Sequence, residues 1–477
     1  MPDENLGPLE LSNAFHSMGY WEGFARSVAA LPRRGNRYRH QAFLSDYQLG
    51  TKPNKHLLSE CAWLAKQLKG GQHVPELIVL LLRSGQCDKA RGALAKFIGL
   101  CNDQGGRFIQ SHPGAVLDLI EGCLGDLEDR DAAILLLNGV ISSRKAFALT
   151  EDLRRAARLL VELRAPIMLW ADWGGLFINH VLFSIWRKQW MEEQSGVEKG
   201  GLQWAAEEER RSEGVLLEAL KIGPPMLGTI LSDLSDRLNA GLSPAINERA
   251  AKGTSKTSEK VPEAFISNQC LRFRFPWFEY LSPSEQNFLF NGEWALLCSP
   301  TPDYSMGLAQ WWRTMESCLN RVLITPLAQL LQSDPSALAA DKQQLSEKKQ
   351  KDEAIFLERL VDPVKSKKLT LSDILLVLNK CVPAGDGKAA QSKLRCLATD
   401  FVQERLVGTE RLVKDRWLNP RKLTSANIDD FRNRASHDRP VEVAQAAVGR
   451  TLARMFFSDF YEPFVGAHEW KPAMLGD

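Results

Sequence analysis

The chain has 477 residues, of which 44% are hydrophobic and 25% are charged, a composition typical of globular proteins. This length predicts roughly two to four domains, with enough apolar residues for a core that needs no disulfides or metals. A net charge of +2 excludes strong attraction of the whole chain to a polyanion, although it leaves room for a local basic patch.

The cysteines are spread singly through the sequence, at positions 61, 87, 101, 123, 270, 298, 318, 381 and 396. There is no CxxC pair and the count is odd, so a zinc site or a disulfide framework is not expected. Free buried thiols in a reducing cytosol fit this pattern, and we expect no metal and no cofactor. The N-terminal residues MPDENLGPLE are acidic and contain no apolar signal core, so we expect a cytoplasmic protein.

Helical patterns follow one another between residues 56 and 240, with apolar residues at three- and four-residue steps. Gly, Pro, Asn and Asp separate these patterns, as is typical of helix boundaries. The predicted helices cover residues 56–68, 75–85, 87–100, 113–124, 131–141, 151–163 and 226–238. We predict an N-terminal multi-helix domain over residues 1–245, which is either a scaffold for a partner or ligand or simply a helical domain.

One apolar stretch, residues 166–186, approaches the length of a membrane span. Asp172, the Gly174–Gly175 pair, Asn179 and His180 interrupt it. A charge near the middle of a span costs about 2.5–3.5 kcal/mol on insertion scales. We therefore predict one or two buried core helices here, and no membrane association.

Residues 246–304 are predicted to connect the N-terminal domain to a C-terminal one. Residues 246–262 are rich in Lys, Ser, Thr and Gly, which indicates a solvated linker, although its lysines could also touch phosphates. Residues 263–300 are rich in aromatics, and the alternation LRFRF at 271–275 predicts a short strand or two. Exposed aromatics beside arginines could stack bases, but we favour packing against the neighbouring helical domain.

A second helical domain is predicted over residues 305–477, which makes the expected fold class all-α. The stripe of a core-facing helix is formed by Leu308, Trp312, Met315, Leu319 and Val322, and Glu316 lies beside this stripe. A charged helix is predicted over 342–361, and further helices over 368–380 and 388–407. The stretch 405–422 is locally basic, with Arg405, Arg411, Lys414, Arg416, Arg421 and Lys422.

The segment FRNRASHDRPVE, residues 431–442, contains an Arg-Asn-x-x-x-His motif made of Arg432, Asn433 and His437. Thr424 or Ser425 can cap a short helix before it, and Asp438 and Pro440 suit the start of the next helix. His437 is therefore expected at a helix–helix junction. The looser pattern of Arg, four residues and His also occurs at Arg107 and His112, but that copy lacks the Asn and is followed by Pro-Gly.

This motif, followed by a long amphipathic helix, resembles the RNxxxH motif of the HEPN superfamily. Residues 311–320 and 368–380 also resemble parts of that helical bundle, so the resemblance covers about residues 305–465. It implies a helical bundle and, as in many HEPN domains, a metal-independent endoribonuclease of a toxin–antitoxin or antiphage system. HEPN domains usually dimerise so that two copies of the motif face one another, and some members are inactive binding modules.

The residue types suit RNA cleavage by the ribose 2′-hydroxyl, which needs proton transfer and stabilisation of a crowded phosphate. Histidine can act as acid or base because its ordinary pKa is about 6.5, and the arginine fork binds phosphate oxygens. We therefore predict that His437 and Arg432 are catalytic. Asn433 is four residues from His437, shares its helix face and could orient the imidazole. Glu316 is a candidate either to orient Arg432 or to form a surface salt bridge. Arg434 and Arg439 either guide a phosphate backbone or are simply solvated arginines, and Arg416, Arg421 and Lys422 are further candidate RNA contacts.

Arg432 and His437 are five residues apart, or about 140° around a helix, so one straight helix cannot direct both at one phosphate. Either the helix ends near His437 or a second subunit of a homodimer supplies one group. The expected partners are RNA, a second copy of the chain, and a protein partner or antitoxin at residues 1–245. Two alternatives remain: a catalytically inactive HEPN RNA-binding or assembly subunit, and a helical scaffold in which the three motif residues only tie two helices together.

Overall fold

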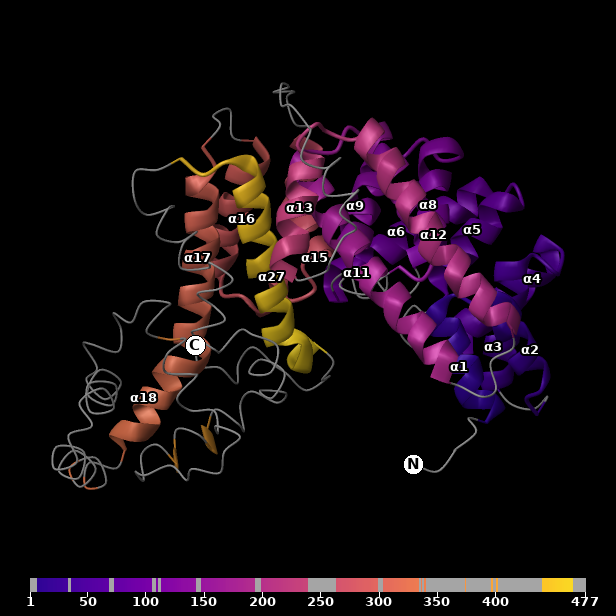
Figure 1. Cartoon of the computed structure of the whole chain (residues 1–477), viewed down its shortest axis with the longest axis horizontal. Helices are drawn as coiled ribbons and strands as arrows, with labels where there is room; N and C mark the ends of the chain where they lie inside the picture. The colour runs from indigo at the N-terminus through magenta and orange to yellow at the C-terminus, as the bar shows by residue number, and fades with distance from the viewer. Residues whose placement is uncertain are drawn as a thin grey trace. The chain divides into compact units, whose positions relative to one another are not determined.

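The computed structural model (Figure 1) describes residues 7–32, 36–67, 73–104, 113–142, 147–193, 199–238, 263–298, 303–333 and 440–465, together with the positions 109, 336, 339, 374, 396, 397, 400 and 401. Every regular element among these residues is a helix, so the predicted all-α fold is confirmed for this part of the chain. The chain divides into two compact units, Met1–Pro276 and Trp277–Asp477.

The helices of the first unit are short and follow one another closely in the sequence. They are α1 (Pro8–Met18), α2 (Trp21–Ala29), α3 (Asn36–Leu49), α4 (Asn54–Gln67), α5 (Val74–Arg83), α6 (Cys87–Gln104), α8 (Pro113–Gly125), α9 (Arg130–Ile141), α10 (Thr150–Glu162), α11 (Ile167–Glu193), α12 (Lys199–Ile222), α13 (Leu227–Leu238), the 3-10 turn η1 (Glu263–Phe265) and α15 (Asn268–Arg274). Most helices pack against the next one in the sequence, as expected for a stacked helical array.

Local sequence signals account for several of these helix ends. Pro75 stands in the first turn of α5, where its missing N–H costs no hydrogen bond. Gly85 ends the same segment with a φ of 71°, a left-handed conformation that side chains disfavour. Asp129 caps α9 by accepting a hydrogen bond from the backbone N–H of Ala132 at 3.0 Å.

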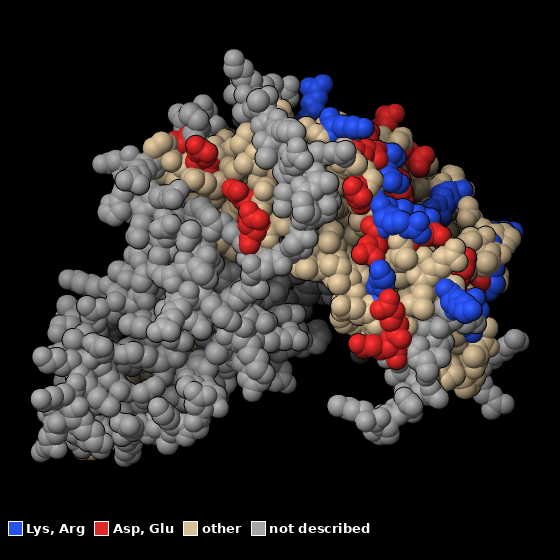
Figure 2. Space-filling view, viewed as in Figure 1, with Lys and Arg blue, Asp and Glu red and all other residues tan. Residues whose placement is uncertain are grey.

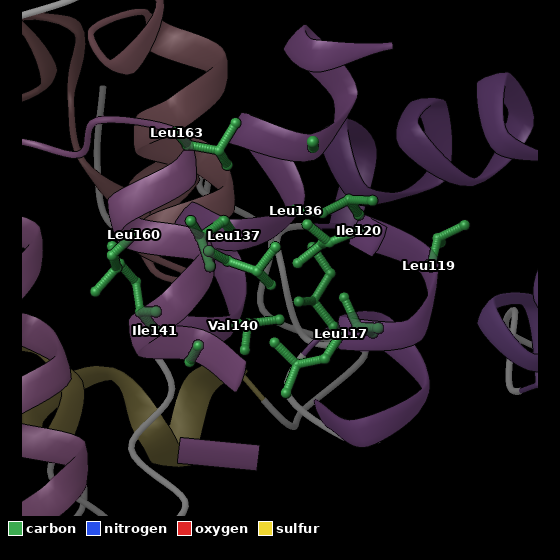
Figure 3. Close-up of a cluster of buried hydrophobic side chains, with 14 of the residues drawn as sticks. Leu117, Leu119, Ile120, Leu136, Leu137, Val140, Ile141, Leu160 and Leu163 are labelled. Atoms are coloured by element: carbon green, nitrogen blue, oxygen red, sulfur yellow. The ribbon is translucent and has the colours of Figure 1, made fainter. Parts of the chain in front are cut away.

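Two hydrophobic clusters hold the first unit together. One is built mainly by α1 to α4 and includes Phe24, Phe43 and Leu64. The other is larger and extends from α5 to α13; Figure 3 shows how Leu117, Leu136 and Leu160 and their labelled neighbours meet within it. α11 belongs to both clusters, since Trp173 lies in the larger one and Met191 in the smaller one.

The apolar stretch predicted to form one or two core helices is a single helix, α11, and much of it is buried. Of the polar residues that interrupt its sequence, Asp172 and His180 are fully buried inside the unit and Asn179 is half-buried. No helix among the described residues is long and apolar enough to cross a membrane.

The strand predicted from the LRFRF alternation is wrong, because residues 271–274 lie in the short helix α15. Ser267 caps this helix by accepting a hydrogen bond from the backbone N–H of Cys270 at 3.0 Å. Phe273, Phe275, Trp277 and Phe278 of this aromatic stretch are buried, so these side chains do not present rings for base stacking, whereas Trp294 is 53% exposed. η1 and α15 belong to the first unit, while residues 246–262 lie outside the described residues.

The second unit contains η2 (Phe278–Tyr280), α16 (Pro283–Cys298), α17 (Ser305–Leu319), the π-helical turn η3 (Asn320–Ile324), α18 (Thr325–Gln332) and α27 (Val443–Val465) among the described residues. The predicted core-facing stripe is present in α17 and η3, where all five of its apolar side chains are buried. α16 and α17 approach closely at two glycines: a Cβ on Gly307 would lie 2.5 Å from Leu296, and one on Gly292 would lie 3.1 Å from the Gly307 carbonyl.

Candidate functional site

The predicted catalytic residues Arg432 and His437 lie outside the described residues. The same holds for the other predicted motif and RNA-contact residues, Asn433, Arg434, Arg439, Arg416, Arg421 and Lys422, and for the looser copy at Arg107 and His112. Glu316 is described and stands half-buried on α17. After the motif, the described residues resume at Pro440, and the contacts of this following segment are given below.

The chain directly after the motif segment is tied to the start of α17. Asp303 Oδ1 accepts hydrogen bonds from the backbone N–H groups of Val441 and Ser305, both at 3.0 Å. The backbone N–H of Tyr304 donates to the Val441 carbonyl, also at 3.0 Å. These donors, Ser305 first and then Val441, hold the pKa of Asp303 below its ordinary value because they stabilise the carboxylate.

This junction sets the direction of two helices. Residue 304 meets residue 441, and further along Trp311 lies against Phe457, with ring centroids 6.1 Å apart. α17 and α27 therefore run in the same direction, side by side as Figure 1 shows. At 1.5 Å per residue, Glu316 lies about 16 Å along α17 from the junction. A long amphipathic helix is predicted after the motif, and one face of α27 is apolar: Ala444, Val448 and Leu452 are buried, as is Val441 just before the helix, while Met455 is half-buried.

A buried ion pair joins α16 to α27. Arg450 donates from Nε to Glu293 Oε1 at 2.6 Å and from Nη2 to Oε2 at 2.9 Å, and both side chains are fully buried. Trp311 on α17 donates its indole N–H to the same Oε1 at 3.0 Å. A two-pronged, charge-assisted pair of this kind fixes the mutual orientation of the three helices. Its members are 157 residues apart in the sequence, and no local pattern reveals them.

The first unit contains a polar cluster that the sequence did not reveal, centred on the buried imidazole of His180. Its Nε2 lies 3.1 Å from both Thr150 Oγ1 and Ser212 Oγ, and 3.4 Å from Ser184 Oγ. Its Nδ1 bonds to the Phe147 carbonyl. The cluster thus joins α10, α11 and α12. The one signal in the sequence is a histidine within an apolar stretch.

Carboxylate and guanidinium groups border this cluster. Glu208 accepts a hydrogen bond from the backbone N–H of Thr150 at 2.9 Å. Arg187 donates to the carbonyl of Ala148 at 2.8 Å and lies over the ring of Trp204, 4.6 Å from its centroid. Burial lowers the pKa of His180 to about 4, so the imidazole is neutral near pH 7.

A histidine beside three hydroxyls could in principle activate one of them as a nucleophile. In this cluster His180, Thr150, Ser184 and Ser212 are all buried, with exposed fractions of 5% or less. A substrate has no access to such a site, so the arrangement acts as a polar tie between helices. Its hydrogen bonds satisfy groups that would be costly to bury alone.

On the face of the first unit that Figure 2 shows, acidic and basic side chains lie interspersed. Arg155 on α10 pairs with Asp118 at 2.6 Å and Glu121 at 2.9 Å on α8. Arg154 and Arg158 both pair with Glu218 on α12, each at 2.9 Å. These arginines are matched by carboxylates, which makes this surface a poor site for a phosphate backbone.

A shallow hollow of about 170 Å³ lies between α3 and α4. Phe43 and Leu57 are among the residues that line it, and two ion pairs stand at its edge. Arg39 pairs with Glu60 at 3.0 Å and Lys52 pairs with Asp46 at 2.6 Å, so the charges of the hollow balance.

The described residues contain no group of three or more His, Cys, Asp or Glu side chains that could hold a metal ion. Comparison with protein-family models, curated proteins and solved structures found no match to this chain.

Proposed function

We propose that the second unit is a HEPN-type, metal-independent endoribonuclease in which His437 and Arg432 are catalytic. The observation that carries the proposal is the strict Arg-Asn-x-x-x-His spacing at residues 432–437, placed directly before a long helix. The predicted products are a 2′,3′-cyclic phosphate and a 5′-hydroxyl. By family analogy alone, the setting is a toxin–antitoxin or antiphage system, in which the first unit binds a partner or senses a trigger.

In the proposed reaction His437 removes the proton of the ribose 2′-hydroxyl, and the 2′-oxygen attacks the adjacent phosphorus. The bond from phosphorus to the 5′-oxygen breaks, and the leaving oxygen takes up a proton from a second acid or from water. Arg432 stabilises the extra negative charge on the phosphate oxygens. Asn433 orients the imidazole of His437. Because one straight helix cannot direct both Arg432 and His437 at the same phosphate, the second copy of the chain in a homodimer supplies one of these two side chains.

The described framework is compatible with this assignment. His437 precedes Val441 by four residues, which span at most about 14 Å of chain. Val441 is held to Asp303 and Tyr304 at the start of α17, and α27 is anchored by the buried pair of Arg450 and Glu293. Catalytic groups need support of this kind, because their geometry must be held to fractions of an ångström.

RNA cleavage in EDTA by the purified full chain tests the proposal. We expect the parent to cut RNA and to leave cyclic-phosphate ends, and Arg432→Ala and His437→Ala to lose at least about 100-fold of the rate. His112→Ala is the matched control, because it removes the histidine of the looser pattern and should cut like the parent.

Two results would contradict the nuclease assignment. One is cleavage that persists in His437→Ala, which would point to a contaminating enzyme or to other residues. The other is binding of varied RNAs without cleavage, with and without candidate partners, which would favour the inactive HEPN RNA-binding or assembly subunit.

A further inference from the structure

Large apolar side chains are concentrated on one exposed face of α11. Leu182, Ile185 and Trp186 expose 40%, 41% and 49% of their surface. They are three of the nine large hydrophobic side chains that are exposed among the described residues, and they lie within a single helical turn. Isolated exposed apolar residues are ordinary, but a contiguous group of them marks an interaction surface.

The spacing of these residues defines a helix face. Positions 182, 185, 186 and 189 are related by steps of three and four, so they line one side of α11. Gln189, at the end of the row, is also exposed. Phe183 stacks against the ring of Trp186, with centroids 5.6 Å apart, which supports the indole from the side. We call this row, residues 182–189, the α11 stripe.

α13 shows what kind of element packs on α11. It packs near the N-terminal end of α11, where a Cβ on Gly174 would lie 2.9 Å from Leu231 and 3.7 Å from Leu234. Its buried apolar residues Leu227, Ile230, Leu231 and Leu234 have the spacing i, i+3, i+4, i+7. α13 is about 18 Å long and α11 about 40 Å, so α11 continues well beyond it, as Figure 1 shows.

The charged residues at the C-terminal end of the stripe indicate which charge a bound ligand should carry. Glu192 and Glu193 are exposed and follow Gln189 directly along the helix. Of the basic side chains within residues 182–189, Arg187 is buried and Lys188 is paired with Glu209 on α12 at 3.1 Å. The stripe is therefore apolar from Leu182 to Trp186, polar at Gln189 and acidic beyond it, which favours a basic ligand and disfavours an anionic lipid surface.

We propose that the α11 stripe docks one amphipathic helix of a partner protein, with apolar residues at i, i+3, i+4, i+7 and basic residues beside them. The docked helix continues the packing that α13 begins on the same helix. Trp186 is the expected anchor, since a half-exposed indole beside other apolar side chains provides the largest area for burial. This inference does not depend on the proposed nuclease, because it concerns the first unit alone.

Binding of labelled helical peptides to the full chain, followed by fluorescence anisotropy, tests the proposal. The peptides are lactam-stapled, because short helices are marginal in water. They share one leucine stripe at i, i+3, i+4, i+7 and differ only in carrying Lys, Gln or Glu on the outer face. We expect the Lys peptide to bind best, and Trp186→Ala and Leu182→Ala each to weaken it by about tenfold.

Two variants distinguish specific binding at the α11 stripe from non-specific hydrophobic binding. Trp294→Ala removes another exposed tryptophan, 53% exposed on α16 of the second unit, and should bind the peptide like the parent. Glu193→Lys should abolish the preference for the Lys peptide over the Glu peptide. Both positions are exposed, so neither change disturbs a core.

Four outcomes would overturn the proposal. The first is that none of the peptides binds, and the second is that Trp186→Ala binds the Lys peptide as tightly as the parent does. The third is that the parent sediments as a dimer and Trp186→Ala as a monomer, which would assign the stripe to a second copy of the chain. The fourth is that neutral lipid vesicles retain the parent but not Trp186→Ala, which would assign the stripe to a membrane surface.

Discussion

The carboxylate of Asp303 accepts a hydrogen bond from the backbone N–H of Val441, 138 residues further along the chain. The same oxygen also accepts a hydrogen bond from the backbone N–H of Ser305, the first residue of α17, so one side chain joins the start of α17 to the segment that leads into α27. We expect Asp303→Ala to destabilise the second unit by about 1–2 kcal/mol, because two backbone hydrogen bonds to a carboxylate are lost. Hydrogen exchange of the peptide that contains Val441 should become faster.

Asp303→Asn is the informative companion, because its amide oxygen can still accept from Val441 and its stability should lie close to the parent. Asp129→Ala removes an aspartate that accepts a backbone hydrogen bond at the start of α9 in the first unit, and it should leave exchange at Val441 unchanged. Equal exchange at Val441 in the parent and in Asp303→Ala would show that the junction does not hold in solution.

The buried pair of Glu293 and Arg450 makes a second prediction about the second unit. Arg450→Met removes the arginine that pairs with the buried Glu293 carboxylate, and we expect a loss of about 3–5 kcal/mol. Adding Glu293→Gln removes the negative charge that Arg450 neutralised and keeps an acceptor for the Trp311 indole, so the double variant should recover most of that loss. Urea denaturation of the parent, both single variants and the double variant measures this coupling. A double variant that is less stable than either single variant would refute it.

His180 makes the stability of the first unit depend on pH. Burial lowers its pKa from 6.5 to about 4, so between these values the unfolded chain binds a proton that the folded chain does not. Stability from this group is therefore fully present above pH 6.5 and is lost as the pH falls toward 4, by about 3 kcal/mol in total. Denaturation of the parent and of His180→Gln at several pH values should show this slope only in the parent.

Asp152 has the opposite effect on the pH dependence of stability, over a pH range that overlaps that of His180. Burial raises its pKa from 3.8 to about 7, so this carboxyl favours the folded state as the pH falls. The difference between parent and His180→Gln isolates the histidine, because Asp152 contributes equally to both. His56→Gln, at an exposed histidine outside the cluster, should keep the full slope of the parent.

Cysteine reactivity should follow burial closely. Burial raises the pKa of the Cys101 and Cys123 thiols to about 12, and it raises that of Cys61 further. Because the thiolate is the reactive form, these three residues should resist iodoacetamide at pH 8 in the folded chain. The exposed Cys396 should be labelled first, as peptide mass spectrometry can show. Rapid labelling of Cys101 in the native protein would contradict this burial.

Helix positions were largely predictable because apolar spacing is a local property. α5, α9 and α10 lie within a few residues of their predicted ranges, and the stripe of α17 is buried as predicted. The prediction at 271–275 was wrong because five alternating residues fit both a strand and one short helix. The cap at Ser267 and the bond from Arg274 Nη2 to Asn138 Oδ1 at 2.6 Å fix the helix there. The second of these contacts joins residues 136 apart, which no local pattern contains.

For the candidate site too, some features are visible in the sequence and others depend on contacts between distant residues. The spacing of Arg432, Asn433 and His437 is visible in the sequence, and their catalytic assignment remains a prediction. The groups that surround a site come from distant parts of the chain. Asp303 beside Val441 is one example, and the hydroxyls of Thr150 and Ser212 around His180 are another. Such contacts depend on how helices pack, so single-sequence patterns cannot supply them.

α11 has a mechanical consequence for the first unit. Its continuous helix contributes Trp173 to one hydrophobic cluster and Met191 to the other, and it behaves as a stiff rod about 40 Å long. A tilt of about 5° around one end displaces the other end by about 3.5 Å, which follows from that length. Because α11 is packed into both clusters, a ligand bound at residues 182–189 would act on both of them through a single helix.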